Sequence, residues 1–280
     1  MVTKLAFLAL ASAVIGSCSA TGVLGNTDRQ ARREALRSAE SFAAVLSVRA
    51  DLDTLATYDV VLLDPAPYEP ADLDRLREAG TLALGYVNIG EVESWRPFAD
   101  RVDPDWVIGA NPDWEGHEFV DAREPGWRQL VVETAARGVQ RRGFGGLFLD
   151  MADVAVIYPE TEAGMVALIR ELRAAYPDLV LVMNRGFPLL DSLDGVIDGL
   201  LVEGVWIGAD LDTGVAVETG EAEREVLLGY LRDVRRAGGA AFVIDYAQTD
   251  EQTAAVRAAA RREGVPVFVG DIDLGRLRLD

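Results

Sequence analysis

Five short apolar runs, each followed by an acidic residue, constrain the fold of this chain more than any other feature of its sequence. The acids that follow these runs are Asp64, Asp150, Glu203, Asp245 and Asp271, the last after one glycine. Aliphatic runs without polar alternation predict strands buried on both faces, as in a parallel sheet. An unpaired charge is costly inside such a strand, so the acids belong at the strand ends. In an α/β barrel these ends surround the pocket, and the sequence therefore predicts a ring of carboxylates around one opening.

Apolar runs alternate with helical patterns from residue 41 onward, which indicates βα units and a parallel sheet. Strands are expected at 42–46, 58–64, 81–88, 118–121, 145–150, 179–184, 199–203, 240–246 and 265–269. Helices are expected between most of them, at 70–79, 127–142, 160–176, 221–237 and 250–263. We therefore expect an α/β fold, a single-domain (β/α)8 TIM barrel over residues 41–280. The shortest candidate, 118–121, is then an extra short strand in the loop after the third barrel strand.

A doubly wound open sheet is the competing fold. Its dinucleotide-binding form carries a Gly-x-Gly-x-x-Gly turn after an early strand. The sequence has no such turn, which favours the barrel.

The first residues have the pattern of an export signal. Lys4 precedes an apolar stretch at 5–15, which is too short to span a bilayer because spanning takes roughly 20 residues. Residues 15–18 resemble the cleavage motif of bacterial lipoproteins. We therefore expect a lipoprotein signal peptide at 1–17 and lipidation of Cys18.

Residues 18–40 are expected to form a tether followed by an N-terminal helix, with Asp28 as its cap. The expected protein is exported and reaches a membrane only through its lipid anchor. A plain secretory signal cleaved near Ala20 is the alternative, and both patterns place the protein outside the cytoplasm.

The charge balance argues against nucleic acid as a partner. The chain carries 46 acidic and 27 basic residues, a net charge of −19, whereas phosphate binding needs a basic face. This balance suits a cationic or neutral ligand, although solubility alone also explains it. One cysteine cannot form an intrachain disulfide, and one histidine, His117, excludes a histidine-rich zinc site. We expect no metal, no cofactor and a monomer.

Asp150 and Glu203 are the expected catalytic pair. Each follows a strongly apolar strand, and in barrel order the two strands are the fourth and the sixth. Glycoside hydrolysis needs two carboxyl groups that face each other across the bond to be cleaved, one protonated and one ionised. The structural alternative is that either acid pairs with an arginine or caps the next helix.

The loop after the third strand mixes the residue types of carbohydrate sites. Tyr86, Asn88, Glu91, Glu93 and Trp95 provide aromatic faces that stack on sugar rings and planar polar groups that bind hydroxyls. We expect them to bind substrate. The alternative is a capping loop with Trp95 packed beneath it.

Further substrate-binding residues are expected at the other strand ends, and each of them has a structural alternative. These residues are Asp64, Asp153, Asn184, Arg185, Asp245, Tyr246 and Asp271. Asp153 lies three residues after Asp150, so it is placed to hold a sugar hydroxyl or to tune Asp150. The same Asp-x-x-Asp spacing suits a hard cation, which leaves a metal-dependent hydrolase as a third hypothesis.

Six blocks of the sequence, taken together, resemble glycoside hydrolase family 114, the endo-α-1,4-polygalactosaminidases and their relatives. The blocks lie in family order at 86–93, 143–153, 184–186, 201–203, 244–246 and 269–273. The resemblance implies a TIM barrel and endo-cleavage of an α-1,4-linked galactosamine-containing polysaccharide, a hexosamine polymer that is cationic when deacetylated. It also implies a retaining mechanism in which Asp150 is the nucleophile and Glu203 the acid/base.

Three positions depart from the family pattern. Met183 precedes Asn184 where many relatives carry glutamine, and Gly204 follows Glu203 where relatives often carry serine or asparagine. Arg185 would repel a cationic sugar unless an acid neutralises it. These departures bear on the substrate more than on the reaction. A non-catalytic carbohydrate-binding lipoprotein on the same barrel is the alternative function.

Overall fold

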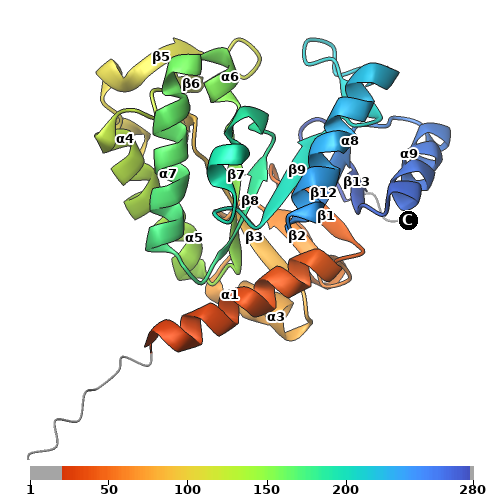
Figure 1. Ribbon diagram of the computed structural model, residues 1–280, viewed down its shortest axis with the longest axis horizontal. Coiled ribbons are helices and arrows are strands. Elements are labelled where there is room, and N and C mark those ends of the chain that lie inside the picture. Colours follow the sequence, from red (N-terminus) through yellow and green to blue (C-terminus); the bar gives the residue numbers. More distant parts are fainter. Residues whose placement is uncertain (1–20, 278–280) are drawn as a thin grey trace, which may run out of the picture.

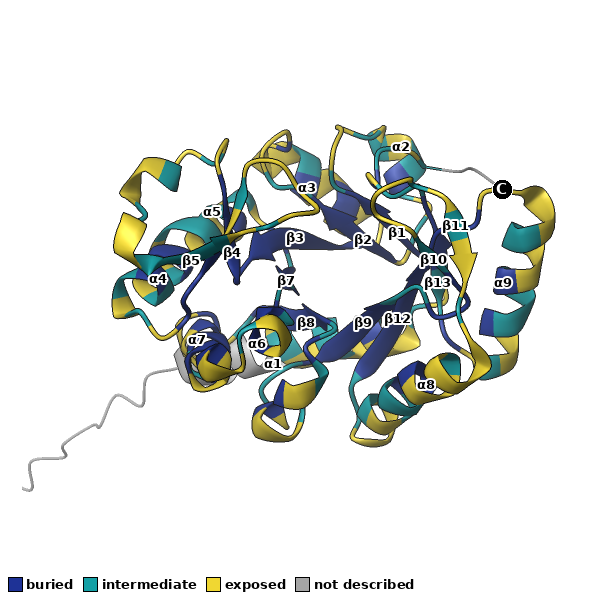
Figure 2. Cartoon of the chain, turned by 90° about the horizontal axis from the view of Figure 1, so that it is seen from above, coloured by how far each residue is buried: buried dark blue, intermediate teal, exposed yellow. Residues whose placement is uncertain are grey.

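Eight parallel strands form one sheet that curves until its two edges nearly meet. The computed structural model describes the backbone of residues 21–277 and the side chains of residues 28–277. In sheet order the strands are β1 (Phe42–Val45), β2 (Val60–Leu63), β3 (Leu82–Asn88), β7 (Gly146–Asp150), β8 (Val180–Asn184), β9 (Gly199–Glu203), β12 (Ala240–Asp245) and β13 (Val267–Val269). Figure 2 looks along this ring of strands. The single-domain α/β barrel predicted from the sequence is confirmed.

The two edge strands, β1 and β13, lie side by side where the barrel closes. The Leu46 backbone N–H donates to the Leu274 carbonyl oxygen at 3.0 Å, just beyond the end of β1. The rings of Phe42 and Phe268 are 6.1 Å apart, and Phe42 also meets Phe242 at 5.1 Å. Aromatic packing between β1, β12 and β13 therefore fills the closing edge of the barrel.

Helices surround the sheet, most of them on its outer face (Figure 1). They are α2 (Leu52–Leu55), α3 (Pro70–Glu78), α4 (Pro125–Leu130), α5 (Arg137–Arg142), α6 (Val154–Ile157), α7 (Glu162–Ala175), α8 (Glu221–Arg236) and α9 (Asp250–Glu263). A π-helical turn at Val131–Ala136 joins α4 to α5, so the helix expected at 127–142 is continuous. Helix α9 has clear end signals: Thr249 and Gln252 form a capping box at its start, and Gly264 ends it in a left-handed conformation.

Two small antiparallel sheets stand on the end of the barrel at which the parallel strands finish. Strands β4 (Glu91–Glu93), β6 (His117–Val120) and β5 (Val107–Ala110) form one sheet, with β6 in the middle. Strands β10 (Ile207–Ala209) and β11 (Ala216–Glu218) form a hairpin. The extra strand expected at 118–121 is thus part of a three-stranded sheet, and the hairpin was not predicted. Both sheets consist of strands of three or four residues, and several of these strands are half-exposed. Such strands lack the continuous apolar run from which a strand is predicted.

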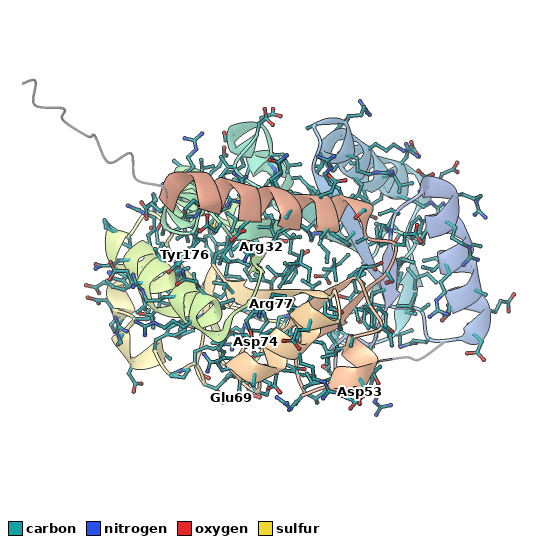
Figure 3. All side chains as sticks on the ribbon, turned by 90° about the horizontal axis from the view of Figure 1, so that it is seen from below. Arg32, Asp53, Glu69, Asp74, Arg77 and Tyr176 are labelled. Carbon is teal, nitrogen blue, oxygen red and sulfur yellow. The ribbon has the colours of Figure 1, made fainter. Side chains whose placement is uncertain are left out.

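The N-terminal helix α1 (Thr21–Ser38) lies across the opposite end of the barrel (Figures 1 and 3). It begins seven residues before Asp28, so most of the expected tether is helical. No proline interrupts this stretch. Figure 3 shows Arg32 on this helix, and its guanidinium donates to the Asp178 carbonyl oxygen at 2.6 Å. Cys18 and the expected signal peptide lie outside the described residues.

One buried carboxylate fastens α1 to the barrel. The Asp198 side chain is fully buried and accepts hydrogen bonds from Arg29 of α1 at 2.8 Å and Arg173 of α7 at 2.6 Å. Arg33 lies 3.1 Å from the same carboxylate, and the Leu181 backbone N–H donates to it at 3.0 Å. Burial lowers the pKa of Arg173 to about 10.

No helix of the described residues is long and apolar enough to cross a membrane.

Replacing Asp198 is expected to destabilise the fold strongly. Asp198→Ala leaves the arginines without their buried partner, and the loss of one member of a buried ion pair costs about 3–5 kcal/mol. The surface acid Asp233, paired with Arg236, is the control, and Asp233→Ala should cost no more than about 1 kcal/mol. Urea denaturation measures both, and equal effects of the two substitutions would contradict the assigned role of Asp198.

Candidate active site

A cavity of about 1580 Å³ opens at the end of the barrel at which the parallel strands finish. It brings together both expected catalytic residues and ten of the twelve expected substrate-binding residues. These twelve lining residues are Asp64, Tyr86, Asn88, Glu91, Glu93, Trp95, Asp150, Asp153, Asn184, Arg185, Glu203 and Tyr246. Of the five strand-end acids that were expected to surround one opening, three line it, namely Asp64, Asp150 and Glu203.

Asp150 and Glu203 face each other across the side chain of Asn184. The Asn184 Nδ2 atom donates to Asp150 Oδ1 at 2.9 Å and to Glu203 Oε1 at 2.6 Å. Because both bonds start from the same nitrogen, the distance between Asp150 Oδ1 and Glu203 Oε1 cannot exceed the sum of the two hydrogen-bond lengths. That limit matches the roughly 5–5.5 Å between the carboxyl groups of retaining glycosidases and falls short of the roughly 6.5–9.5 Å of inverting enzymes.

A left-handed residue follows each of these three side chains. Met151 (φ 62°) comes after Asp150, Arg185 (φ 52°) after Asn184 and Gly204 (φ 68°) after Glu203. Such a residue turns the chain sharply where the strand ends. A Cβ atom at Gly204 would also lie 3.1 Å from the Gly208 Cα atom. Glycine at 204, one of the departures from the family pattern, thus fits the turn that leads into the β10–β11 hairpin.

Burial raises the pKa of both carboxyl groups above the ordinary values. For Glu203 the negative charge of Asp150 adds to the effect of burial, while hydrogen bonds from Tyr246 and Asn184 oppose it. The Tyr246 hydroxyl donates to Glu203 Oε2. For Asp150, burial acts against hydrogen bonds from Asn184, the Met151 backbone and Tyr86. In Glu203, burial and the charge of Asp150 favour the protonated form. In the neighbouring Asp150, three hydrogen-bond donors favour the ionised form against the effect of burial.

A polar network extends from Tyr86 to the three-stranded sheet. The Asn88 amide donates to the Tyr86 hydroxyl at 3.3 Å and to Glu91 at 3.4 Å. Asn111 donates to Glu91 Oε1 at 2.6 Å, and His117 Nδ1 lies 2.9 Å from Glu91 Oε2. The Glu91 side chain is 1% exposed, so these partners occupy it fully.

Arg96 joins two other acids of the mouth. Its guanidinium contacts Glu93 at 2.5 and 3.0 Å and Asp64 at 2.8 Å, and it lies over the Tyr86 ring. Trp95 stands beside this group at the cavity rim and is 59% exposed. Its ring meets His117 edge-on at 5.0 Å, and the Trp114 ring lies 6.2 Å from the same histidine. Two exposed aromatic rings thus border the opening, as carbohydrate stacking requires.

Two expected substrate-binding residues do not line the cavity, and these expectations need correction. Asp245 is fully buried, and its carboxylate accepts the backbone N–H groups of Val205, Trp206 and Ile207 at 2.8–3.0 Å. Asp245 therefore holds the entry to the β10–β11 hairpin. Asp271 accepts the Gly275 backbone N–H at 2.9 Å, which shapes the turn after β13.

The sequence reasoning did not propose His117 and Asn111 as site residues, and it counted Arg96 only as one of the mixed residue types in the loop after the third strand. His117, Asn111 and Arg96 line the cavity and position the acids Glu91 and Glu93. His117 and Asn111 flank the Asp113–Gly116 turn, which looked like an ordinary polar loop. The one signal in the sequence was that the only histidine of the chain lies three residues after Trp114. Among the described residues, no three His, Cys, Asp or Glu side chains gather where they could hold a metal ion.

The model of glycoside-hydrolase family GH114 matches residues 25–279. An uncharacterized protein of Deinococcus radiodurans is 26% identical over 242 residues, covering 80% of this chain and 76% of that protein. The glycoside hydrolase domain of PelA from Pseudomonas aeruginosa superposes with a TM-score of 0.78 at 27% identity, covering 86% of this chain and 98% of that one. Ega3 of Aspergillus fumigatus, solved in complex with galactosamine, shares the fold with a TM-score of 0.71 at 15% identity, covering 84% and 92% of the two chains.

Removing the Tyr246 hydroxyl is expected to raise the pKa of Glu203. The hydroxyl donates to the carboxylate and stabilises its ionised form, so Tyr246→Phe shifts the equilibrium toward the protonated acid. Carboxyl-carbon NMR titration measures the change. Tyr176, whose hydroxyl donates to the Val132 carbonyl oxygen, provides the control, and Tyr176→Phe should leave the Glu203 titration in place. A lowered or unchanged Glu203 pKa in Tyr246→Phe would show that the bond does not act as described.

Proposed function

The chain belongs to glycoside-hydrolase family GH114, and on that basis we propose that it hydrolyses an α-1,4-linked galactosamine-containing polysaccharide. The proposed cleavage is endo-acting and retains the anomeric configuration. The single observation that carries the proposal is the Asn184 amide bonded to both Asp150 and Glu203. This amide sets the two carboxyl groups at the separation expected for retention.

In the first step, Asp150 attacks the anomeric carbon while Glu203 gives its proton to the leaving glycosidic oxygen. The bond between the sugar and the leaving chain breaks, and an ester between the sugar and Asp150 forms. In the second step, Glu203 takes a proton from water, and the resulting oxygen nucleophile displaces Asp150. Both carboxyl groups then return to their starting states.

The electrostatics of the pair support this exchange of roles. Burial, together with the charge of Asp150, raises the pKa of Glu203 before the reaction, which favours the protonated acid. Ester formation removes that charge, so the pKa of Glu203 falls when it must act as a base. The hydrogen bonds from Tyr246 and Asn184 then stabilise the carboxylate that has given up its proton.

The substrate proposal draws on charge and on similarity. Glu91, Glu93, Asp64 and Asp153 add acidic side chains to the catalytic pair, and a cationic hexosamine chain suits such an opening. The galactosamine bound to Ega3 supports the same sugar class. A carbohydrate-binding protein without catalysis is the alternative, since exposed Trp95 suits both functions. A binder has no use for two carboxyl groups held at this separation.

We further propose that the protein is exported as a lipoprotein, attached to the membrane through Cys18, and acts as a monomer. The support for export and anchoring is the sequence pattern at 1–18. Such an anchor holds an enzyme at a membrane face without a transmembrane helix.

Neutralising either member of the pair is expected to abolish cleavage while leaving the fold intact. Asp150→Asn removes the nucleophile and Glu203→Gln removes the proton donor, so each should lower kcat by at least about 1,000-fold. Mass analysis of products from purified galactosamine polysaccharide measures the loss. Asp74→Asn, on the far end of the barrel (Figure 3), is the control with an equal change in charge. Normal turnover by either site variant would sink the assignment.

Replacing Cys18 is expected to release the protein from the membrane. The thiol is the proposed site of lipid attachment, so Cys18→Ser should move the protein from the membrane fraction to the soluble fraction. Labelling with a radioactive fatty acid should fail in the same variant. Membrane association that survives the substitution would contradict the anchor.

A further inference from the structure

Asp153 differs from the acids that surround it in having no firm partner. Asp64 and Glu93 bind Arg96, and Glu91 is enclosed by Asn88, Asn111 and His117. Asn184 and Tyr246 donate to the catalytic pair. Apart from its own backbone amide, the Asp153 carboxylate has one cationic partner within the described residues, Arg185 with its Nε atom at 3.8 Å. Asp153 is therefore the acid of this group that remains free to take a ligand.

The opposing cation, Arg185, is held in place by other contacts. Its Nη1 atom donates to the Glu203 carbonyl oxygen at 3.3 Å, and its guanidinium carbon lies 5.5 Å from the centre of the Phe187 ring. Phe187 in turn stacks on Tyr230 at 4.3 Å. These contacts can therefore hold the Arg185 side chain in position when its contact with Asp153 is lost. A charge-assisted hydrogen bond between nitrogen and oxygen measures about 2.7–2.9 Å, so the 3.8 Å contact leaves both groups with unused capacity.

This pair borders the reacting groups. Asp153 lies three residues after Asp150, and Arg185 directly follows Asn184, which bonds to both catalytic carboxyl groups. The charges interact as well, because Asp150 raises the pKa of Asp153 after the larger effect of burial, and Arg185 opposes that rise. A sugar bound at Asp150 and Glu203 thus meets an acceptor and a donor beside the catalytic pair.

We propose that Asp153 and Arg185 form a subsite that distinguishes a free amine from an N-acetyl group on the hexosamine. This inference rests on the proposed function. The two forms of the sugar differ at one nitrogen, which is an ammonium group with hydrogens to donate or an acetamide with a carbonyl oxygen to accept. Asp153 binds the ammonium group and Arg185 repels it, whereas Arg185 donates to the acetamide carbonyl. The balance of the two residues sets the acetylation state that the enzyme prefers.

Binding to an enzyme that cannot turn over tests the subsite. In the Glu203→Gln background, calorimetry measures the affinity for α-1,4-linked galactosamine tetrasaccharide and for its fully N-acetylated form. Asp153→Asn should lower the ratio of amine to acetyl affinity about tenfold, as expected for the loss of a hydrogen bond between charged groups. Arg185→Met should raise the same ratio. Opposite shifts of this affinity ratio in the two variants indicate that the residues recognise the nitrogen substituent. A general structural role would lower the affinity for both tetrasaccharides alike.

The control removes a charge elsewhere at the mouth. Glu223 is exposed, lies in the first turn of α8 and lines the cavity, so Glu223→Gln should leave the ratio within about twofold of its starting value. An unchanged ratio in Asp153→Asn, or an equal shift in the Glu223 control, would overturn the subsite. Failure of the proposed function gives a different result, because the unsubstituted enzyme would then leave both tetrasaccharides uncut whatever the binding ratios.

Discussion

The amide nitrogen of Asn184 donates to two carboxylates on neighbouring strands, and the geometry of the whole mouth follows from that arrangement. Strands β7, β8 and β9 are adjacent in the sheet, and each ends on one member of the group. The middle strand supplies a neutral donor, whereas the outer strands supply acids. Parallel register therefore determines the carboxyl separation before any substrate is present, which is the preorganisation that catalysis requires.

Crowding acids into one half-buried opening carries an electrostatic cost. The structure offsets it mainly with neutral donors, namely asparagine amides, tyrosine hydroxyls and backbone N–H groups, and uses Arg96 where two acids can share one cation. Neutral donors stabilise a carboxylate without fixing its charge as a full ion pair does. Asp150 and Glu203 are thus free to change protonation, while Glu93 and Asp64 are tied to one arginine.

The barrel strands and the catalytic pair could be predicted from the sequence because each depends on local pattern. Strand boundaries fell within one or two residues of those observed, since buried parallel strands are continuous apolar runs. Asp245 shows where this reasoning ends, because it follows the same kind of run as Asp150 but is buried under Val205 and Ile207. What separates the two acids is the path of the loop after β9, whose backbone N–H groups bind Asp245. A strand-end pattern carries no information about that path.

Helix α1 crosses the end of the barrel opposite the mouth and is fastened there by Asp198 (Figure 1). A link made to the amino end of this helix would thus leave the opening unobstructed. On a surface, the barrel would stand with its base toward the support and its entrance toward the medium. A long polymer could then enter from solution along its own length, without having to thread between the enzyme and whatever holds it.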